Sequence, residues 1–435
     1  MKSSTKFYIC TFGCRCNQAD SAEMRARLCG GSLHESETPT DASLIVVNSC
    51  TVTRRADQQV RQSLRRLHRE NPDATIVVTG CYAERDPETV AAIPGVSLVL
   101  GNADKCRLPE LSGDGQGSMG RIIRTPLEAE KDRLIIGALH LGGKTRPYVK
   151  LQDGCDARCA YCIVPSVRGH GRSAAPEEIL AEIRSLVDRG YQEIVLTGVH
   201  LGSYGRGLPQ PIRLAELLRR ILEIPGLGRL RLSSVEPMRF DRSIVDLAAA
   251  NPAFAPHFHI PLQSGSDRIL RRMRRPYTAA RFLDLLHYIR ASLPAAALGT
   301  DVLVGFPGET DDDFEATLDL VRKSPLTYLH VFPFSAREGT EACSMPEQVS
   351  PRRLHERCEI LREFSVARNL AFRQRFVGQV LPAISLAEQE GMGKSVALTA
   401  NYIHARIGGP SVPPNHLIRI RIDEVDAQGT RATSV

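Results

Sequence analysis

The residues with the most evident chemistry are three cysteines in one short stretch of the chain. Cys155, Cys159 and Cys162 follow a C-x3-C-x2-C spacing within the sequence QDGCDARCAYC, residues 152–162. A loop of this length can turn three thiolates toward one point, and cysteine thiolates are the usual ligands of iron–sulfur clusters. A cubane cluster has four irons, so three cysteines leave one iron open to chemistry. The spacing therefore predicts an iron–sulfur site with an open iron.

A zinc-binding loop and buried thiols without a metal are the alternatives to this iron–sulfur site. Zinc loops usually carry paired C-x2-C or Cys/His ligands, and no such second pair follows the stretch. The spacing favours the cluster, although the alternatives stay open on these residues alone.

A second group of cysteines follows strands that are predicted in the first part of the chain. Apolar runs alternate with helical patterns and predict parallel strands at residues 7–12, 43–48, 75–79 and 96–100. Cys14, Cys50 and Cys81 each stand two residues after one of the first three runs. Because sites in open α/β sheets form at the carboxyl ends of the strands, we expect these thiols to share one site. Three unrelated half-buried cysteines are the alternative.

The first predicted helix connects the first two of these strands. It is expected to begin near Asn17, a residue type that caps helices, and to stop at Gly30 and Gly31. Cys10 falls within the preceding strand and Cys16 at the opening of the helix, so neither is counted as a ligand.

Length and composition bound the class of protein. The 435 residues predict two or three domains, and 42% hydrophobic residues are ample for ordinary cores. No run of about 18 apolar residues predicts a membrane-spanning helix, and the first residues lack a signal-peptide pattern. A cytoplasmic protein without a membrane partner is expected, whose 12 cysteines are reduced and better explained as metal ligands than as disulfides. The net charge of +7 is compatible with a nucleic-acid partner.

A repeating strand–helix pattern fills the middle of the chain. Six strands are predicted at residues 148–151, 193–197, 230–233, 257–261, 299–305 and 328–332. Six parallel strand–helix units predict an open, partial (β/α)6 barrel of the TIM type, with its site at the carboxyl ends of the strands. Polar residues at these ends could hydrogen-bond a ribose or a methionyl amine, with ordinary turn chemistry as the alternative: Glu236, Gln263, Ser264 and Asp301. The basic run at residues 271–275 is either a solvated surface or a contact to RNA phosphates.

The last part of the chain predicts a small all-β barrel. Short alternating segments, separated by Gly, Pro and Asn turns, stand at residues 379–385, 395–399, 402–407 and 417–422. Tyr402 and Arg406 would put an aromatic ring and a base near one surface, as is common at RNA contacts. A structural cap without RNA is the alternative. The predicted domains are an N-terminal open parallel α/β domain, a linker, the partial barrel and the small β-barrel, at residues 1–111, 112–142, 143–375 and 378–435.

The stretch from Cys155 to Cys162, with an aromatic residue before its last cysteine, resembles the radical S-adenosylmethionine (SAM) enzymes. The resemblance implies a [4Fe–4S] cluster on these three cysteines, whose open iron is chelated by the amino and carboxyl groups of SAM. Electron transfer, from a donor of the flavodoxin or ferredoxin type, then cleaves SAM to a 5'-deoxyadenosyl radical. In such enzymes the cofactor carries the radical chemistry and the protein positions it.

A three-cysteine α/β domain before such a loop resembles the methylthiotransferase family. The matching segments are residues 11–17 (TFGCRCN), 48–53 (NSCTVT) and 79–81 (TGC). The resemblance implies a second [4Fe–4S] cluster on Cys14, Cys50 and Cys81, which binds or donates the inserted sulfur. Family members usually have a lysine–valine pair where this chain has Arg15 and Cys16.

The same resemblance implies contacts to SAM and an RNA-binding module. Thr197 and Gly198 stand in the segment that meets the SAM amino group, and the cavity is lined by residues in family motifs, which are here Glu236, Gln263 and Asp301. The C-terminal barrel resembles the TRAM module that ends many members of the family. The fold that follows is an α/β cluster domain, a radical SAM partial barrel and a TRAM-like barrel.

The implied reaction is methylthiolation of an unactivated C–H bond. One SAM methylates a sulfur at the second cluster, and another SAM is cleaved to the radical that activates the substrate carbon. Residues 48–57, followed by Arg61 and Gln62, resemble the branch that acts at C2 of N6-threonylcarbamoyladenosine beside the anticodon of tRNA. Arg168, Arg172 and Arg337 are candidates to bind the carboxylate of that substrate. The alternatives are isopentenyladenosine in tRNA, a ribosomal protein, or a non-enzymatic iron–sulfur redox or RNA-binding protein.

Overall fold

The computed structural model describes residues 6–31, 33–113, 120–127, 145–390 and 394–435. These residues form two compact units. The first unit combines residues 1–140, 148–175 and 335–343, and the second combines residues 141–147, 176–334 and 344–435. Most of the predicted linker, residues 112–142, lies outside the described residues, and the predicted domain boundaries stay predictions. No helix among the described residues is long and apolar enough to cross a membrane.

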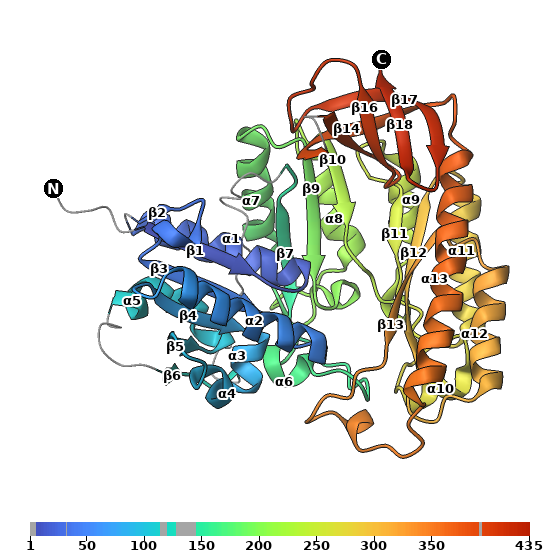
Figure 1. The fold of residues 1–435 in the computed structure, drawn as a ribbon. Helices are drawn as coiled ribbons and strands as arrows, with labels where there is room; N and C mark the ends of the chain where they lie inside the picture. The colour runs from blue at the N-terminus through green and yellow to red at the C-terminus, as the bar shows by residue number, and fades with distance from the viewer. Residues whose placement is uncertain (1–5, 32, 114–119, 128–144, 391–393) are drawn as a thin grey trace. The chain divides into compact units, whose positions relative to one another are not determined.

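The first unit is built on a six-stranded parallel sheet with the order β2-β1-β3-β4-β5-β6 (Figure 1). Its strands are β1 (Lys6–Thr11), β2 (His34–Glu35), β3 (Leu44–Ser49), β4 (Thr75–Gly80), β5 (Val96–Leu100) and β6 (Arg121–Ile123). The helices among them are α1 (Arg15–Gly30), α2 (Arg54–Glu70), α3 (Cys81–Arg85), α4 (Pro87–Ala91) and α5 (Leu108–Gly113). The four predicted apolar strands are confirmed as β1, β3, β4 and β5.

Alternation along the strands divides the core of this sheet between its two faces. Side chains of successive strand residues point to opposite faces. Val47 of β3 therefore packs in the cluster that contains Leu64 of α2. Its neighbour Val46 packs in the other cluster, with Met24 and Leu28 of α1. Helices thus cover both faces of the sheet, with α2 on one face and α1 on the other.

The start of α1 differs from the sequence prediction. The helix begins at Arg15, with Cys14 as its N-cap residue, so Asn17 lies inside the helix. The amide of Asn17 donates hydrogen bonds to the carbonyl oxygens of Phe12, at 2.8 Å, and Ser49, at 3.0 Å. The prediction was wrong because Asn17 satisfies carbonyl groups at the ends of two strands, a long-range role that a capping pattern does not show. The predicted stop at Gly30 is confirmed.

The first unit also contains residues 148–175. This segment comprises β7 (Tyr148–Asp153), α6 (Val164–Arg168) and β8 (Arg172–Ser173), with β7 and β8 paired antiparallel. β7 is the first strand predicted for the central barrel, and the cysteine loop follows it directly.

The second unit contains the other five predicted strands of the central barrel. They are β9 (Glu193–Gly198), β10 (Arg229–Leu232), β11 (His257–His259), β12 (Ala297–Val304) and β13 (Tyr328–Pro333). β9 pairs parallel with β10, and β12 pairs parallel with both β11 and β13. The helices are α7 (Pro176–Asp188), α8 (Leu214–Leu222), α9 (Ser243–Ala250), α10 (Asp267–Arg272), α11 (Ala279–Ser292), α12 (Asp311–Lys323) and α13 (Pro351–Gln374). All six predicted strands are confirmed.

A closed five-stranded barrel ends the chain, in the order β14-β15-β16-β18-β17. Its strands are β14 (Val380–Glu390), β15 (Lys394–Thr399), β16 (His404–Gly408), β17 (Leu417–Asp426) and β18 (Gly429–Ser434). The predicted small barrel is confirmed, although β18 was not among the predicted strands. Its core continues into Phe372 and Phe376, at and just after the end of α13. The barrel therefore shares apolar packing with the rest of the second unit.

Candidate functional site

The ends of three neighbouring strands bring Cys14, Cys50 and Cys81 to one edge of the first sheet. Cys14 follows β1, Cys50 follows β3 and Cys81 opens α3 after β4, and these strands are adjacent. Gly13 has a φ of +95°, and a Cβ atom at this position would lie 2.6 Å from the Cβ of Cys50. The loop before Cys14 thus fits against Cys50 only because position 13 has no side chain.

The thiols of these cysteines influence one another electrostatically. A hydrogen bond from Cys16, with smaller contributions from the Arg168 guanidinium and the Asn17 N–H, lowers the pKa of Cys14 to about 5. Burial, together with negative charge on Cys81 and Cys14, raises the pKa of Cys50 to about 12. Because burial and the negative charge of neighbouring thiolates both oppose ionisation of Cys50, the three thiols cannot all ionise without a compensating cation. The donor set therefore fits a bound iron–sulfur cluster, because a coordinated metal holds thiols in the deprotonated form.

Arg168 lies at the centre of a buried ionic network in the same unit. Its guanidinium donates hydrogen bonds to Asp153 at 2.7 and 2.9 Å, and lies 3.1 Å from Asp20. It also donates to the side-chain oxygen of Asn17. Burial raises the pKa of Asp20, but Lys105, Lys150 and Arg168 outweigh it and hold that pKa well below the usual range.

The network joins the two cysteine segments. Lys150 of β7 donates to Asp153 at 2.6 Å and also to Asp20 of α1, and Lys105 donates to Asp20 at 2.6 Å. Asp153 stands two residues before Cys155, and Asp20 lies on the helix that Cys14 caps. One set of buried charges thus holds the backbone next to Cys155 and the helix that begins at Cys14.

The C-x3-C-x2-C loop is held by backbone hydrogen bonds. Gly154 has a φ of +69°, and a Cβ there would lie 2.0 Å from the carbonyl oxygen of His170. The N–H of Cys155 donates to Gly169 O at 3.0 Å, and the N–H of Ala157 donates to Cys155 Sγ at 3.4 Å. Hydrogen bonds to the sulfur ligands are one of the means by which proteins tune clusters. All three cysteines of the loop are half-buried.

The residues predicted to contact SAM lie in the second unit. Thr197, which is buried, and Gly198 end β9. Glu236 follows β10 and is paired with Arg275. Gln263 has a φ of +67°, and its N–H donates to the carbonyl oxygen of Asp301 at 2.8 Å. The structure thus brings Gln263 and Asp301 together.

Two histidines that the sequence analysis missed surround Asp301. His259 Nε2 lies 2.9 Å and His330 Nδ1 lies 3.4 Å from the same carboxylate oxygen. Burial raises the pKa of Asp301, but hydrogen bonds from these imidazoles hold it well below its usual range. One potential ligand atom from each of His259, Asp301 and His330 lies within 4.8 Å of the other two, which is close enough for the three residues to hold a metal ion. Asp301 of β12 stands directly opposite His330 of β13, and this strand pairing, which no local pattern in the sequence shows, brings the two side chains together.

The chain was compared with protein families and with individual known proteins. Residues 149–321 match the Radical SAM superfamily, and residues 6–101 match the uncharacterized protein family UPF0004. The chain is 35% identical to "Threonylcarbamoyladenosine tRNA methylthiotransferase MtaB" of Rickettsia prowazekii, over 94% of this chain and 92% of that protein. It is 34% identical to the protein of the same name from Bacillus subtilis, over 95% and 92%.

The chain belongs to the radical SAM methylthiotransferase family. Members of the Radical SAM superfamily use SAM and a [4Fe–4S] cluster. The chain is also 34% identical to "tRNA-2-methylthio-N(6)-dimethylallyladenosine synthase" of Mycobacterium ulcerans, over 97% of this chain and 82% of that protein. The fold resembles that of the radical SAM methyltransferase TsrM from Kitasatospora setae, with a TM-score of 0.58 at 16% identity, over 78% of this chain and 77% of that one.

Two of the three arginines predicted to bind a substrate carboxylate are paired within this methylthiotransferase itself. Arg168 is buried against Asp153 and Asp20. Arg337 is buried and donates to Thr51 and Asp57, both at 2.7 Å. A substrate carboxylate would have to replace these partners, so both residues act first as structural anchors. The third, Arg172, is half-buried in β8.

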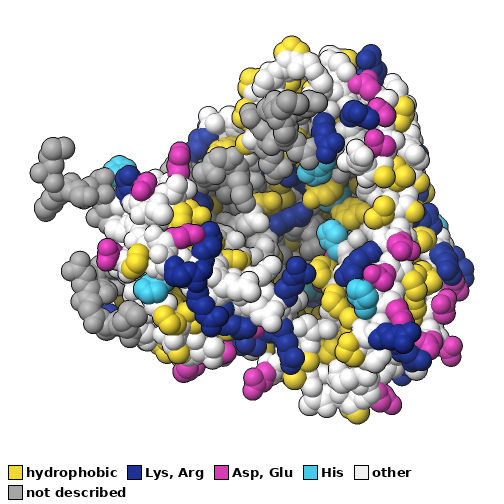
Figure 2. All heavy atoms as spheres, in the orientation of Figure 1, with side chains coloured by type: hydrophobic (Ala, Val, Ile, Leu, Met, Phe, Trp, Pro, Cys, Tyr) yellow, Lys and Arg dark blue, Asp and Glu magenta, His cyan; other side chains and the backbone are white. Residues whose placement is uncertain are grey.

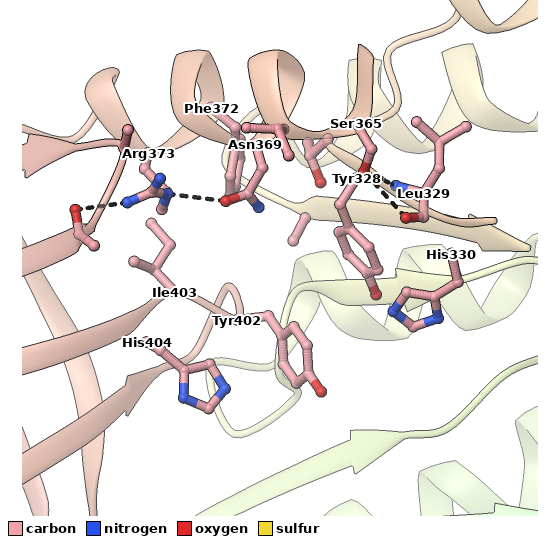
Figure 3. Close-up of a pocket in the computed structure, with 15 residues that line it drawn as sticks. Tyr328, Leu329, His330, Ser365, Asn369, Phe372, Arg373, Tyr402, Ile403 and His404 are labelled. Atoms are coloured by element: carbon pink, nitrogen blue, oxygen red, sulfur yellow. Dashed lines mark hydrogen bonds between the residues drawn. The ribbon is translucent and has the colours of Figure 1, made fainter. Parts of the chain in front are cut away.

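The ring of Tyr402, from the C-terminal barrel, packs against His257 on β11 of the central strands. Tyr402 is half-buried, with a φ of +69°, and its ring stacks on His257 with the centroids 3.9 Å apart. The guanidinium of Arg231 lies 5.3 Å from the same ring. Figure 3 shows Tyr402 and His404 beside a cavity of about 490 Å³, with Tyr328 and His330 from β13 and a wall formed by α13. Tyr402 thus links the small barrel to the strands, while Arg406 lies half-buried on β16.

Proposed function

We propose that this methylthiotransferase modifies C2 of N6-threonylcarbamoyladenosine in tRNA, giving the 2-methylthio derivative. The observation that carries this proposal is the pairing, in one compact unit, of a C-x3-C-x2-C loop with three further cysteines at neighbouring strand ends. One site suits the generation of a radical and the other the presentation of sulfur. The substrate is supported by the relatives whose names specify threonylcarbamoyladenosine tRNA.

Each cysteine group has a separate role in this proposal. Cys155, Cys159 and Cys162 would hold the [4Fe–4S] cluster that, when bound with SAM, supplies radical chemistry. Cys14, Cys50 and Cys81 would hold a second [4Fe–4S] cluster that supplies the sulfur. The chain contributes positioning: the Ala157 N–H donates to the Cys155 sulfur, and the buried Arg168 places positive charge near Cys14.

The second unit would bind SAM and orient it. Thr197 and Gly198 end β9 and are proposed to accept hydrogen bonds from the SAM amino group. Glu236, Gln263 and Asp301 are proposed to line the cavity. The carboxylate of Asp301 is held ionised by His259 and His330, which suits it to accept a hydrogen bond from a ribose hydroxyl.

The partners of the reaction follow from its chemistry. The tRNA is the proposed substrate, with contacts proposed at Tyr402, Arg406 and Arg172. An electron donor of the flavodoxin or ferredoxin type is required for reductive cleavage of SAM. Isopentenyladenosine tRNA is the second candidate substrate, because a relative named as a dimethylallyladenosine synthase is about as similar to the chain.

The test is a reconstituted reaction with two matched substrates. Anaerobic protein, SAM and a chemical reductant are incubated with tRNA that carries either threonylcarbamoyladenosine or isopentenyladenosine, and the nucleosides are analysed by mass spectrometry. The expected result is a methylthio product only from the first tRNA. A product only from the second would replace the proposed substrate, and SAM cleavage without methylthio product from either would overturn the reaction class.

A further inference from the structure

One face of α2 carries an unusual concentration of positive charge. The helix contains six arginines, five of them exposed and one half-buried: Arg54, Arg55, Arg61, Arg65, Arg66 and Arg69. With 3.6 residues per turn, these positions fall within an arc of about 140° around the helix. The opposite side carries Val60, Leu64 and Leu67, which are buried against the sheet. These six residues are called the α2 arginine face.

The charge of this face is poorly neutralised by the protein. Arg66 pairs with Glu70 at 3.3 Å, and this pair is largely exposed and contributes little. The helix's other acid, Asp57, is buried and pairs with Arg85 and Arg337. Within the described ranges, Arg54, Arg55, Arg65 and Arg69 have no acidic partner. Figure 2 shows a diagonal run of dark-blue side chains over the region where Figure 1 shows α2.

Such a pattern is unfavourable for the isolated fold. Like charges four residues apart on a helix destabilise it by a few tenths of a kcal/mol, and Arg61, Arg65 and Arg69 form two such pairs. Between Arg54 and Arg69 the other exposed residues of the helix are glutamines and none is an acid, namely Gln58, Gln59 and Gln62. An anionic ligand would remove this repulsion.

The arginine face begins beside one of the candidate sulfur-site cysteines. Cys50 is separated from Arg54 by only three residues. Thr53 caps the helix, and its hydroxyl accepts from the N–H of Ala56 at 3.1 Å. Arg337 holds the helix start through Thr51 and Asp57, and the N–H of Arg54 donates to Ser335 Oγ at 3.2 Å. From Arg54 to Arg69 the face extends about 22 Å, at 1.5 Å per residue.

We propose that the α2 arginine face binds the phosphate backbone of the RNA substrate and leads the strand to the edge where Cys50 lies. This inference rests on the proposed function in tRNA modification. Arginine suits the role because its planar guanidinium binds phosphate through two hydrogen bonds, and glutamine amides add contacts to phosphate and sugar. The charge extends along about 22 Å of the helix, which is long enough to contact several successive phosphates.

The test is the salt dependence of tRNA binding by full-length protein. The variant carries Arg55→Gln, Arg65→Gln and Arg69→Gln, which removes three exposed charges from one line. Its matched control carries Arg213→Gln, Arg322→Gln and Arg352→Gln, which removes three arginines whose side chains are 87%, 53% and 89% exposed elsewhere. A third protein carries lysine at positions 55, 65 and 69. Thermal unfolding verifies that all four proteins are folded.

The wild-type protein should lose tRNA affinity as salt rises from about 50 to 200 mM. We expect the glutamine variant to bind at least about tenfold more weakly at low salt, with a salt slope smaller by roughly two, because three phosphate contacts are lost. The control should keep the slope, and the lysine variant should keep most of it. An unchanged slope in a folded glutamine variant would overturn the inference.

Two further outcomes separate this inference from its alternatives. Unchanged tRNA binding together with slower reduction by a flavodoxin-type donor would assign the face to an acidic protein and overturn the RNA contact. Failure of the proposed function is seen independently, because wild-type protein would then give no methylthio nucleoside. If the wild-type protein binds tRNA and forms the product, but the glutamine substitutions change nothing, only the RNA-binding role of the α2 arginine face is contradicted.

Discussion

The guanidinium of Arg168 lies 3.1 Å from the carboxylate of Asp20, which joins two segments that each follow a candidate cluster ligand by six residues. Arg168 comes six residues after Cys162, and Asp20 comes six residues after Cys14. Both side chains are buried, so the pair holds the helix that follows one cysteine group to the helix that follows the other. The relative placement of the two cysteine groups therefore depends on this contact.

Replacing Arg168 with Gln should strongly destabilise the first unit. The substitution leaves Asp153 and Asp20 with fewer partners in a buried site, and breaking a buried charge network typically costs about 3–5 kcal/mol. Urea unfolding of the apo protein measures the effect. Arg352→Ala is the comparison, because its pair with Glu356 is exposed and should contribute little to stability. Equal effects of the two substitutions would show that the network is not structural.

Cys14 should be alkylated more readily than Cys50 in the apo protein. Its pKa is lowered to about 5, whereas burial raises the pKa of Cys50 to about 12. At about pH 6.5 Cys14 is then mostly thiolate, the reactive form, and Cys50 is not. Peptide mass spectrometry after brief treatment with iodoacetamide measures this order.

Cys16→Ala is the partner experiment for Cys14. The substitution removes the hydrogen bond that contributes most to the low pKa, so alkylation of Cys14 at about pH 6.5 should slow and recover at higher pH. If Cys14 reacts equally fast with and without Cys16, the pKa of Cys14 is set by something else.

Gly13→Ala should selectively impair iron binding by Cys14, Cys50 and Cys81. The added Cβ would lie 2.6 Å from the Cβ of Cys50 and sits at a φ of +95°, so Cys50 must move. Iron per chain should fall by about half, while an SAM-dependent change in the spectrum of the remaining cluster persists. Gly207→Ala is the control, because it has a φ of +80° but no atom within 4 Å of the added Cβ. Full iron content in Gly13→Ala would argue against Cys50 as a ligand.

Simultaneous replacement of Cys155, Cys159 and Cys162 with Ala should give the complementary result. About half of the iron should be lost together with all SAM cleavage, because these cysteines are the proposed ligands of the cluster that binds SAM.

Replacement of Cys14, Cys50 and Cys81 should leave at least part of the SAM cleavage and abolish methylthio product. Iron content unaffected by the first triple substitution would contradict the assignment.

Much of the fold was predictable because it depends on local patterns. Apolar runs located four strands of the first sheet and the six strands predicted for the central barrel, and the recurrence of a cysteine two residues after three of them placed those cysteines at one edge. Apolar runs did not locate every strand of the small barrel. β18 was missed because its sequence, GTRATS, is polar and pairs through its backbone with β16 and β17.

Long-range side-chain partners were not predictable. Nothing near Arg337 in the sequence indicates that it binds Asp57, which is 280 residues away. Asn17 was predicted as a helix cap, and instead joins the ends of two strands. His330 and Asp301 meet only because β12 and β13 pair in a particular register. In each case the deciding partner is set by the packing of distant elements.

Nucleoside mass spectrometry of tRNA from cells that lack this protein is the decisive test of its reaction and substrate. We expect 2-methylthio-N6-threonylcarbamoyladenosine to disappear without the protein and to return on complementation. Its unmodified precursor should accumulate in the deletion strain, and the methylthio-isopentenyl nucleoside should be unaffected. Loss of the isopentenyl derivative instead, or a mass change confined to a ribosomal protein, would contradict it.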